Sequence, residues 1–112
     1  MSLRPYKKWS PEEREAMFQL TLREIERLGM PRYPDKCSFC GQTEGIIEWH
    51  NENYSHPTKY LKAVCYRCHM AIHCKWRVPQ RVKEYFDMVK IGYTYPPVFH
   101  RNFGIVRRDH GF

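Results

Sequence analysis

Two pairs of cysteines in the middle of the chain have the spacing of a zinc site. Cys37 and Cys40 form one Cys-x-x-Cys pair, and 24 residues separate Cys40 from Cys65, which begins a second pair that ends at Cys68. Because two intervening residues let one tight turn supply two ligands, four such thiolates can complete the tetrahedral shell that structural Zn²⁺ prefers. We therefore predict one structural zinc ion that closes a hairpin. Uncoordinated or redox-active thiols are the alternative.

Three histidines beside these pairs could hold a second ion. His69 follows the second pair directly and His73 comes four residues later, so a helix would present both on one face. His50 ends a short apolar segment, with Glu48 and Glu52 nearby as oxygen ligands. An imidazole can deprotonate water, and a divalent ion can stabilise charge on a phosphate. The set therefore suits metal-assisted phosphodiester hydrolysis, unless each histidine is an ordinary surface or core residue.

Short elements must position these side chains. Residues 46–50 are apolar and β-branched and predict one strand, and residues 60–64 predict a second. The polar, turn-prone stretch 51–57 would join them as a hairpin, and residues 68–76 would form a helix after it. Gly41 follows the first cysteine pair, where the chain must turn tightly around a metal ion. The sequence thus places all three histidines on one ββα unit.

An amphipathic helix is predicted before this unit. Ser10 and Glu13 form a capping box, and Pro11 suits the first helical position. Gly29 supplies a stop, so the helix is expected to end near residue 28. Its apolar stripe most simply packs on the core, with a dimer contact as the alternative. The stripe consists of Met17, Phe18, Leu22, Ile25 and Leu28.

A second amphipathic helix is predicted after the unit. Pro79 opens it and Gly92 ends it. Residues 93–112 mix aromatic and basic side chains, and the prolines at 96–97 keep this segment extended. We expect either an ordered arm over the domain or a flexible tail. Cys74, which belongs to neither pair, suits a buried apolar position.

The charge of the chain favours a polyanionic partner. Lys and Arg number 19 against 12 Asp and Glu, which gives a formal net charge of +7 over 112 residues. Residues 75–112 hold 8 basic and 3 acidic side chains, so most of the positive field lies in the C-terminal third. A basic, soluble surface without such a partner is the alternative.

Composition also restricts the class of protein. The chain has no run of about 18 apolar residues that would cross a membrane, and its first residues lack the apolar core of a signal peptide. Its five cysteines, four of them in metal-type pairs, favour reduced thiols in the cytoplasm over disulfides outside the cell. We expect a cytoplasmic protein with no membrane partner.

Residues 37–76 resemble the HNH endonucleases, which are ββα-metal nucleases. Many members frame the active hairpin with two Cys-x-x-Cys pairs and end it with Cys-x-x-Cys-His, as the segment ending at His69 does here. The resemblance implies that His50 is the general base, that His69 binds the catalytic metal and that His73 assists it. The family metal is usually Mg²⁺ or Mn²⁺, and some members use Ni²⁺ or Zn²⁺.

Two positions depart from the family pattern. The family commonly has Asp or His immediately before the base, where this chain has Trp49, and an orienting Asn where this chain has Tyr60. Asn51 or Asn53 could take over the orienting role from the loop, and Glu48 or Glu52 could supply the missing carboxylate. In a second register His50 is the metal ligand, and Asn51 then takes the base position, although an amide cannot act as a base.

The resemblance and the pattern of elements imply an α+β fold in a single domain. Its centre is a zinc-stapled ββα-metal core of the HNH, treble-clef-like kind at residues 37–76. Residues 1–36 supply a basic arm and the N-terminal helix, and residues 77–112 supply the C-terminal helix and a basic aromatic tail.

We therefore expect an HNH-type endonuclease that hydrolyses DNA phosphodiester bonds by nicking or structure-specific cleavage, with low sequence specificity. One alternative is a non-catalytic zinc-binding DNA or RNA module that retains the HNH frame. Another is a protein-interaction domain that forms a homodimer. The predicted phosphate contacts are basic side chains of the core and tail: Arg67, Lys75, Arg77, Arg101, Arg107 and Arg108.

Overall fold

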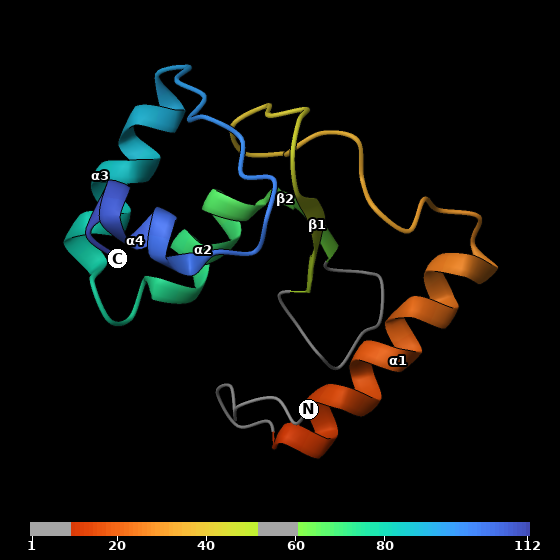
Figure 1. The fold of residues 1–112 in the computed structure, drawn as a ribbon. Helices are drawn as coiled ribbons and strands as arrows, with labels where there is room; N and C mark the ends of the chain where they lie inside the picture. The colour runs from red at the N-terminus through yellow and green to blue at the C-terminus, as the bar shows by residue number, and fades with distance from the viewer. Residues whose placement is uncertain (1–9, 52–60) are drawn as a thin grey trace. The chain divides into compact units, whose positions relative to one another are not determined.

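A computed structural model describes residues 10–51 and 61–112 of the chain. Within these residues it contains four helices and one two-stranded antiparallel sheet (Figure 1), which confirms the α+β class. In chain order the elements are α1 (Pro11–Arg27), β1 (Ile47–Asn51), β2 (Leu61–Cys65), α2 (Tyr66–Cys74), α3 (Pro79–Lys90) and α4 (Phe103–His110). None of these helices combines the length and apolar character needed to cross a bilayer.

The described residues fall into two compact units. The first unit holds residues 10–32 together with Asn51, Leu61 and Lys62, and it contains α1. The second unit holds residues 33–50 and 63–112. All the cysteines and the three histidines of the predicted sites lie in the second unit.

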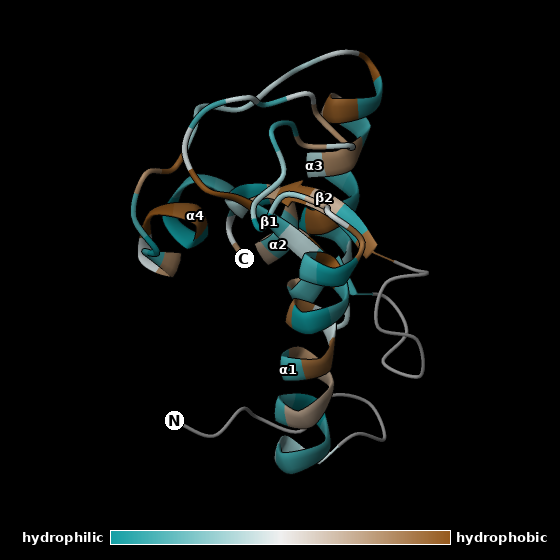
Figure 2. Ribbon diagram, turned by 90° about the vertical axis from the view of Figure 1, so that its right-hand side faces the viewer, coloured by the Kyte–Doolittle hydropathy of each residue, from teal (hydrophilic) through white to brown (hydrophobic). Residues whose placement is uncertain are grey.

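Helix α1 begins and ends where its capping signals predict. The Ser10 side chain accepts a hydrogen bond from the Glu13 backbone at 3.1 Å, and the Glu13 carboxylate accepts one from the Ser10 backbone at 3.1 Å. Gly29 has a positive φ of 70° just after the helix. The turns of α1 alternate between hydrophilic and hydrophobic colouring in Figure 2. Ile25 is 3% exposed but Phe18 is 51% exposed, so only part of the predicted stripe is buried.

The core of the second unit forms around α2. Helices α3 and α4 both pack against it (Figure 1). The largest fully buried side chains include Tyr85 of α3, Val106 of α4 and the C-terminal Phe112. The Arg77 guanidinium donates a 2.5 Å hydrogen bond to the Phe112 carbonyl, which fixes the end of the chain against the residues that follow α2.

Helix α4 was not predicted, because residues 93–112 were expected to form either an ordered arm over the domain or a flexible tail, without a helix. The extended part covers residues 93–102, and the helix follows it. Gly111 ends α4 with a φ of 72° and donates its N–H to the Arg107 carbonyl at 2.8 Å. Val106 is fully buried and ties the helix to the core. A glycine after two basic residues was the available signal for this helix end.

The segment before β1 is held by a close backbone approach. Ile46 donates its N–H to the Val98 carbonyl at 2.8 Å, and its own carbonyl accepts from Tyr66 at 3.0 Å. Gly45 has a φ of 72°, and a Cβ built there would lie 2.5 Å from the Val98 oxygen. Glycine is therefore the residue that lets residues 45–46 lie against the extended C-terminal segment.

Replacing Gly45 with alanine should destabilise the second unit more than the same change at Gly111. Both glycines have a φ of 72°, so both variants carry the same left-handed backbone penalty. At Gly111 the nearest atoms belong to the movable Arg81 side chain, whereas at Gly45 they are backbone atoms. We expect Gly45→Ala to lower the free energy of unfolding by about 1–3 kcal/mol more than Gly111→Ala in denaturant titrations. Equal losses would contradict the close approach.

Candidate metal centres

The four paired cysteines converge on one point, as predicted. Their sulfur atoms all lie within 4.8 Å of one another, and the Sγ atoms of Cys40 and Cys65 are 3.7 Å apart. A tetrahedral ion with Zn–S bonds of about 2.3 Å has S···S edges of about 3.8 Å. None of these cysteines forms a disulfide. The cysteine cluster (Cys37, Cys40, Cys65 and Cys68) can therefore hold a structural metal ion such as zinc.

A glycine turn shapes the first cysteine pair. Gly41 has a φ of 80° and donates its N–H to the Cys37 carbonyl at 3.0 Å. The Cys37 N–H in turn donates to the Gln42 carbonyl at 2.8 Å. The Ser38 N–H donates to the Ala63 carbonyl of β2 at 2.8 Å, which fixes the first pair beside the strand that leads into the second.

The second pair opens helix α2. The Cys65 sulfur caps this helix by accepting the Cys68 N–H at 3.5 Å. The Tyr85 hydroxyl of α3 lies 3.1 Å from the Cys68 sulfur. Since a metal-bound thiolate carries no proton, this hydroxyl would be the donor, and it would stabilise the charge on the sulfur. Burial raises the pKa of Tyr85, so its hydroxyl keeps its proton.

The sulfurs are too close for all four to be thiolates without a cation. Hydrogen bonds from the other three cysteines lower the pKa of Cys37. Hydrogen bonds to Cys37 and Cys40 raise the pKa of both Cys65 and Cys68, so protons stay on those two thiols. A divalent ion would remove this repulsion and bind four deprotonated ligands. The donor set therefore fits zinc.

Three imidazoles form a second cluster. Ligand nitrogens of His50, at the end of β1, and of His69 and His73 on α2 all lie within 4.8 Å of one another. The Nε2 atoms of His69 and His73 are 3.0 Å apart. The ring of His50 lies 5.1 Å from that of His69 and 5.3 Å from that of His73, measured between centroids. The predicted ββα unit thus brings the histidine cluster (His50, His69 and His73) together.

A carboxylate orients one ring of this cluster. Glu48 Oε1 lies 2.6 Å from His69 Nδ1, and the other Glu48 oxygen pairs with Arg101. Burial alone would raise the pKa of Glu48, but the hydrogen bonds to His69 and Arg101 and their charges lower it to about 2. Because an ionised carboxylate can only accept a hydrogen bond, His69 Nδ1 is the donor to Glu48, and its Nε2 faces His73 within the cluster.

The cluster is shielded to different degrees. His50 is only 3% exposed, whereas the His69 and Glu48 side chains retain some exposure. Three imidazole nitrogens suit Zn²⁺, Ni²⁺, Cu²⁺ or Fe²⁺, whereas Mg²⁺ prefers oxygen ligands. These residues could therefore hold a transition-metal ion and leave coordination positions open on the solvent side of His69 and His73.

Two of the predicted phosphate contacts, Arg67 and Arg77, are bonded to the C-terminal segment. Arg67 is 5% exposed and donates to the Pro96 carbonyl at 2.7 Å and to the Asp109 carboxylate at 2.8 Å. The hydrogen bond from Arg67 also lowers the pKa of Asp109. Arg77 holds the Phe112 carbonyl. Both arginines therefore stabilise the packing of the C-terminal segment.

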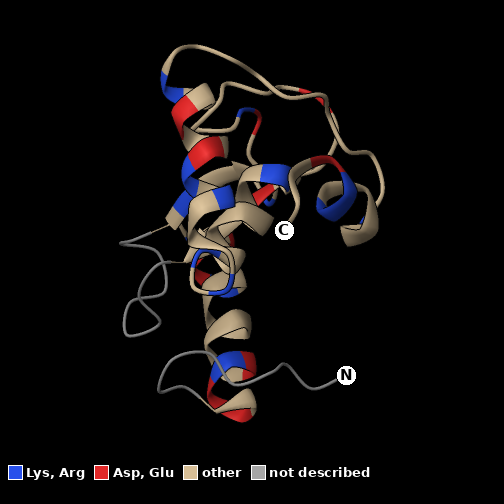
Figure 3. Ribbon diagram, turned by 90° about the vertical axis from the view of Figure 1, so that its left-hand side faces the viewer, with Lys and Arg blue, Asp and Glu red and all other residues tan. Residues whose placement is uncertain are grey.

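Arg77 is nevertheless exposed, and the other predicted contacts differ in accessibility. Lys75 is half-buried beside the exposed Trp76 ring, and the arginines at 101, 107 and 108 are exposed. Figure 3 shows basic residues on α4 and charges of both signs along α3. Asn51 is the last residue of β1, whereas Glu52 and Tyr60 lie outside the described residues.

Sequence reasoning missed the partners that orient the two clusters. Glu48 was predicted as an oxygen ligand, but it binds His69 and Arg101. Tyr85 was not predicted to lie beside Cys68. Arg101 and Glu48 are 53 residues apart, so no local pattern could have paired them.

Comparison with protein-family models, curated proteins and solved structures gives no match to this chain. The likeness to the HNH nucleases therefore stays a sequence-based prediction. Because a fold alone does not determine an activity, the function is inferred from the geometry of the two clusters.

Proposed function

We propose that this protein is a metal-dependent endonuclease of the HNH type that hydrolyses DNA phosphodiester bonds. The observation that carries the proposal is the meeting of three imidazoles on a ββα unit, with Glu48 orienting His69. The cysteine cluster at the start of α2 would hold the hairpin and that helix in register. Such an arrangement is costly to build by chance, because it gathers three titratable rings at one point.

We propose that all three histidines are metal ligands. A general base must reach the attacking water, and the burial of His50 suits a ligand better than a base. This assignment follows the second register of the family pattern. The ion would polarise the phosphate and lower the pKa of a bound water to near 7, so that no separate side-chain base is required. Glu48 would hold His69 in the ligating tautomer.

The donor set favours Zn²⁺, Ni²⁺ or Mn²⁺ over Mg²⁺. Imidazole is a borderline ligand that suits late first-row metals, and Mg²⁺ dehydrates reluctantly and is normally held by carboxylates. Mn²⁺ accepts both kinds of ligand. This preference narrows the sequence-based expectation, which was Mg²⁺ or Mn²⁺ with Ni²⁺ or Zn²⁺ as further options.

DNA would be held mainly through its phosphates. Of the predicted phosphate contacts, Lys75 is half-buried just after α2 and Arg101 pairs with Glu48 beside the histidine cluster, and the exposed Arg107 and Arg108 extend the positive charge over α4. Contacts of this kind carry no sequence information, so binding should be largely sequence-independent and should weaken steeply with salt. A homodimer that supplies targeting stays a prediction.

A non-catalytic zinc-binding nucleic-acid module is the second candidate. The burial of His50 favours it, because a fully enclosed metal site is structural whereas a catalytic site keeps an open position. In this second candidate function, the cysteine cluster and the histidine cluster would each hold a structural metal ion. Salt-dependent DNA binding without cleavage, whatever divalent ion is supplied, would support it.

Nicking of supercoiled plasmid tests the proposal. The purified protein, with its cysteine-bound zinc retained, is incubated with Mn²⁺, Zn²⁺, Ni²⁺ or Mg²⁺, and relaxed and linear products are followed on gels. We expect relaxed circles with at least one of the first three ions and weaker activity with Mg²⁺. No product with any ion would refute the nuclease.

Replacing Glu48 with glutamine should lower the cleavage rate and the affinity for the second ion about 10–100-fold. This is the usual cost of losing the carboxylate that orients a ligating histidine. Glu44→Gln is the matched control, since the Glu44 side chain is exposed on the same segment. A metal titration measures the affinity for the second ion, and plasmid nicking measures the cleavage rate. Equal behaviour of the two variants would show that Glu48 does not orient the site.

A further inference from the structure

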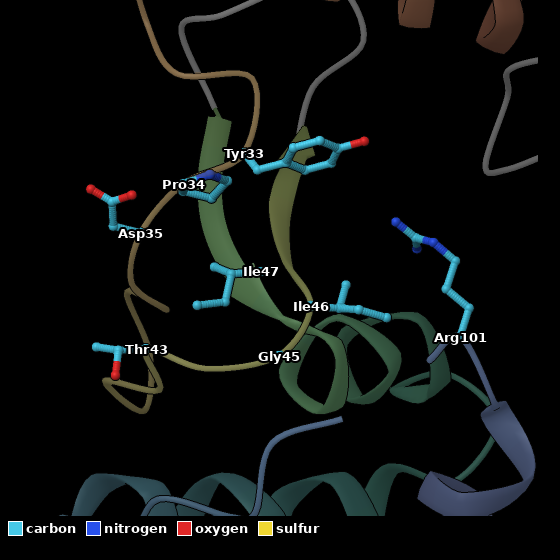
Figure 4. Close-up of a pocket in the computed structure, with 8 residues that line it drawn as sticks. All are labelled: Tyr33, Pro34, Asp35, Thr43, Gly45, Ile46, Ile47 and Arg101. Atoms are coloured by element: carbon cyan, nitrogen blue, oxygen red, sulfur yellow. The ribbon is translucent and has the colours of Figure 1, made fainter. Parts of the chain in front are cut away.

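A cavity of about 560 Å³ opens in the second unit, and none of its lining residues belongs to the cysteine cluster. Its volume lies within the range of about 300–1,000 Å³ that is typical of small-ligand sites. Figure 4 shows the Tyr33 ring and the Arg101 guanidinium both projecting toward the space beside Ile46. The lining residues are Tyr33, Pro34, Asp35, Thr43, Gly45, Ile46, Ile47 and Arg101.

The lining combines the groups that bind a nucleotide outside a double helix. Tyr33 is 59% exposed and offers an aromatic face, on which a nucleobase can stack whatever its identity. Ile46 supplies an apolar surface beside it. The guanidinium of Arg101 matches a phosphate in charge and in hydrogen-bond geometry. Asp35 and Thr43 add polar groups to the lining on the side away from Arg101.

Arg101 connects this cavity to the histidine cluster. Its guanidinium pairs with one oxygen of Glu48, and the other Glu48 oxygen bonds His69. The Arg101 side chain is still more than half exposed, so the guanidinium keeps donor edges for a ligand. A phosphate bound at Arg101 would therefore lie close to the ring that we assign as a metal ligand.

We propose that this cavity binds an unpaired nucleotide next to the phosphate that is cleaved. The preferred substrate would then be DNA with a single-stranded segment, such as a flap or a gap, and not a continuous duplex. In a duplex both faces of each base are already stacked, so Tyr33 has nothing to bind. This inference rests on the proposed function for the cleavage step, but the binding step can be measured separately.

Fluorescence anisotropy with the full chain tests the inference. Three labelled DNAs of one sequence are compared without added divalent ion: a duplex, a single strand and a duplex with a flap. The variants are Tyr33→Leu, which removes the ring, and Tyr33→Phe, which keeps it. Tyr93→Leu is the matched control, because Tyr93 is an exposed tyrosine outside the cavity. Zinc content and circular dichroism confirm that each variant is folded.

We expect the wild-type protein to bind the flap and the single strand more tightly than the duplex. Tyr33→Leu should lose about tenfold in affinity for the two unpaired substrates and should bind the duplex as before. Tyr33→Phe and Tyr93→Leu should retain the preference. A wild-type protein with no preference, or a Tyr33→Leu loss that is equal on all three DNAs, would overturn the inference.

The two proposals fail separately in these experiments. A protein that prefers unpaired DNA through Tyr33 but never cleaves it would keep the cavity assignment and refute the nuclease. A protein that cleaves DNA with no dependence on Tyr33 would keep the nuclease and refute the cavity assignment.

Discussion

Replacing Cys68 with serine is expected to release zinc and to unfold the second unit. Four thiolates in one structural site contribute about 10–16 kcal/mol of apparent binding free energy. This binding free energy is as large as the whole free energy of unfolding of a typical domain, which is about 5–15 kcal/mol. Cys68 is fully buried and lies in the first turn of the helix that carries His69 and His73. We therefore expect the variant to lack bound zinc and to show no cooperative thermal transition for this unit.

Cys74→Ser is the matched control for this experiment. Cys74 is also buried, but it lies outside the cysteine cluster. It should keep its zinc and lose only about 1–3 kcal/mol, the cost of burying a hydroxyl in an apolar site. Metal analysis of the dialysed proteins and thermal unfolding measure both effects. An unchanged zinc content in Cys68→Ser would show that the cluster does not bind the metal.

Replacing His69 with alanine is expected to abolish cleavage, with a loss of more than about 100-fold. Loss of a residue that only orients a ligand already costs 10–100-fold, and His69 is proposed as a ligand itself. Alanine is a strong helix former, so α2 should persist. The variant should therefore keep its zinc at the cysteine cluster and its thermal transition. His100→Ala is the matched control, because His100 is exposed and outside the histidine cluster.

His50→Ala distinguishes the two roles open to His50. As a ligand, its loss should weaken binding of the second ion along with cleavage. As a base, its loss should lower cleavage while metal affinity stays the same. Titration of the apo histidine cluster with Co²⁺, followed by absorption, measures the affinity. Full activity in both His50→Ala and His69→Ala would mean that a contaminating nuclease cleaved the plasmid.

The sequence predicted the parts of the fold that depend on local signals. The capping box at Ser10 and the proline at position 79 placed the starts of α1 and α3 correctly. The strands were predicted within one residue, and the i, i+4 spacing placed His69 and His73 on one helix face. Cysteine spacing predicted the convergence of four sulfurs, because tetrahedral coordination leaves few alternatives for two such pairs.

Contacts between distant parts of the chain could not be predicted. The buried partners of Arg67 lie in the C-terminal segment, and the sequence offers only a basic residue between two cysteines. Arg67 was therefore predicted to contact a phosphate. Helix α4 was missed for a related reason. The helix is stabilised by the packing of Val106 in the core and by contacts with α2, and its sequence carries no strong local helix pattern.

Both clusters depend on the first turns of α2, since Cys68 and His69 are consecutive residues of that helix. The two metal ions should therefore bind in a fixed order. The cysteine cluster should bind the first ion, and only the helix that this ion stabilises should hold the histidine cluster in a geometry that binds the second ion. Oxidation of the thiols would therefore release the metal ions from the cysteine cluster and from the histidine cluster together. Any hydrolytic activity would consequently be silenced in an oxidising environment and restored by a reductant together with fresh zinc.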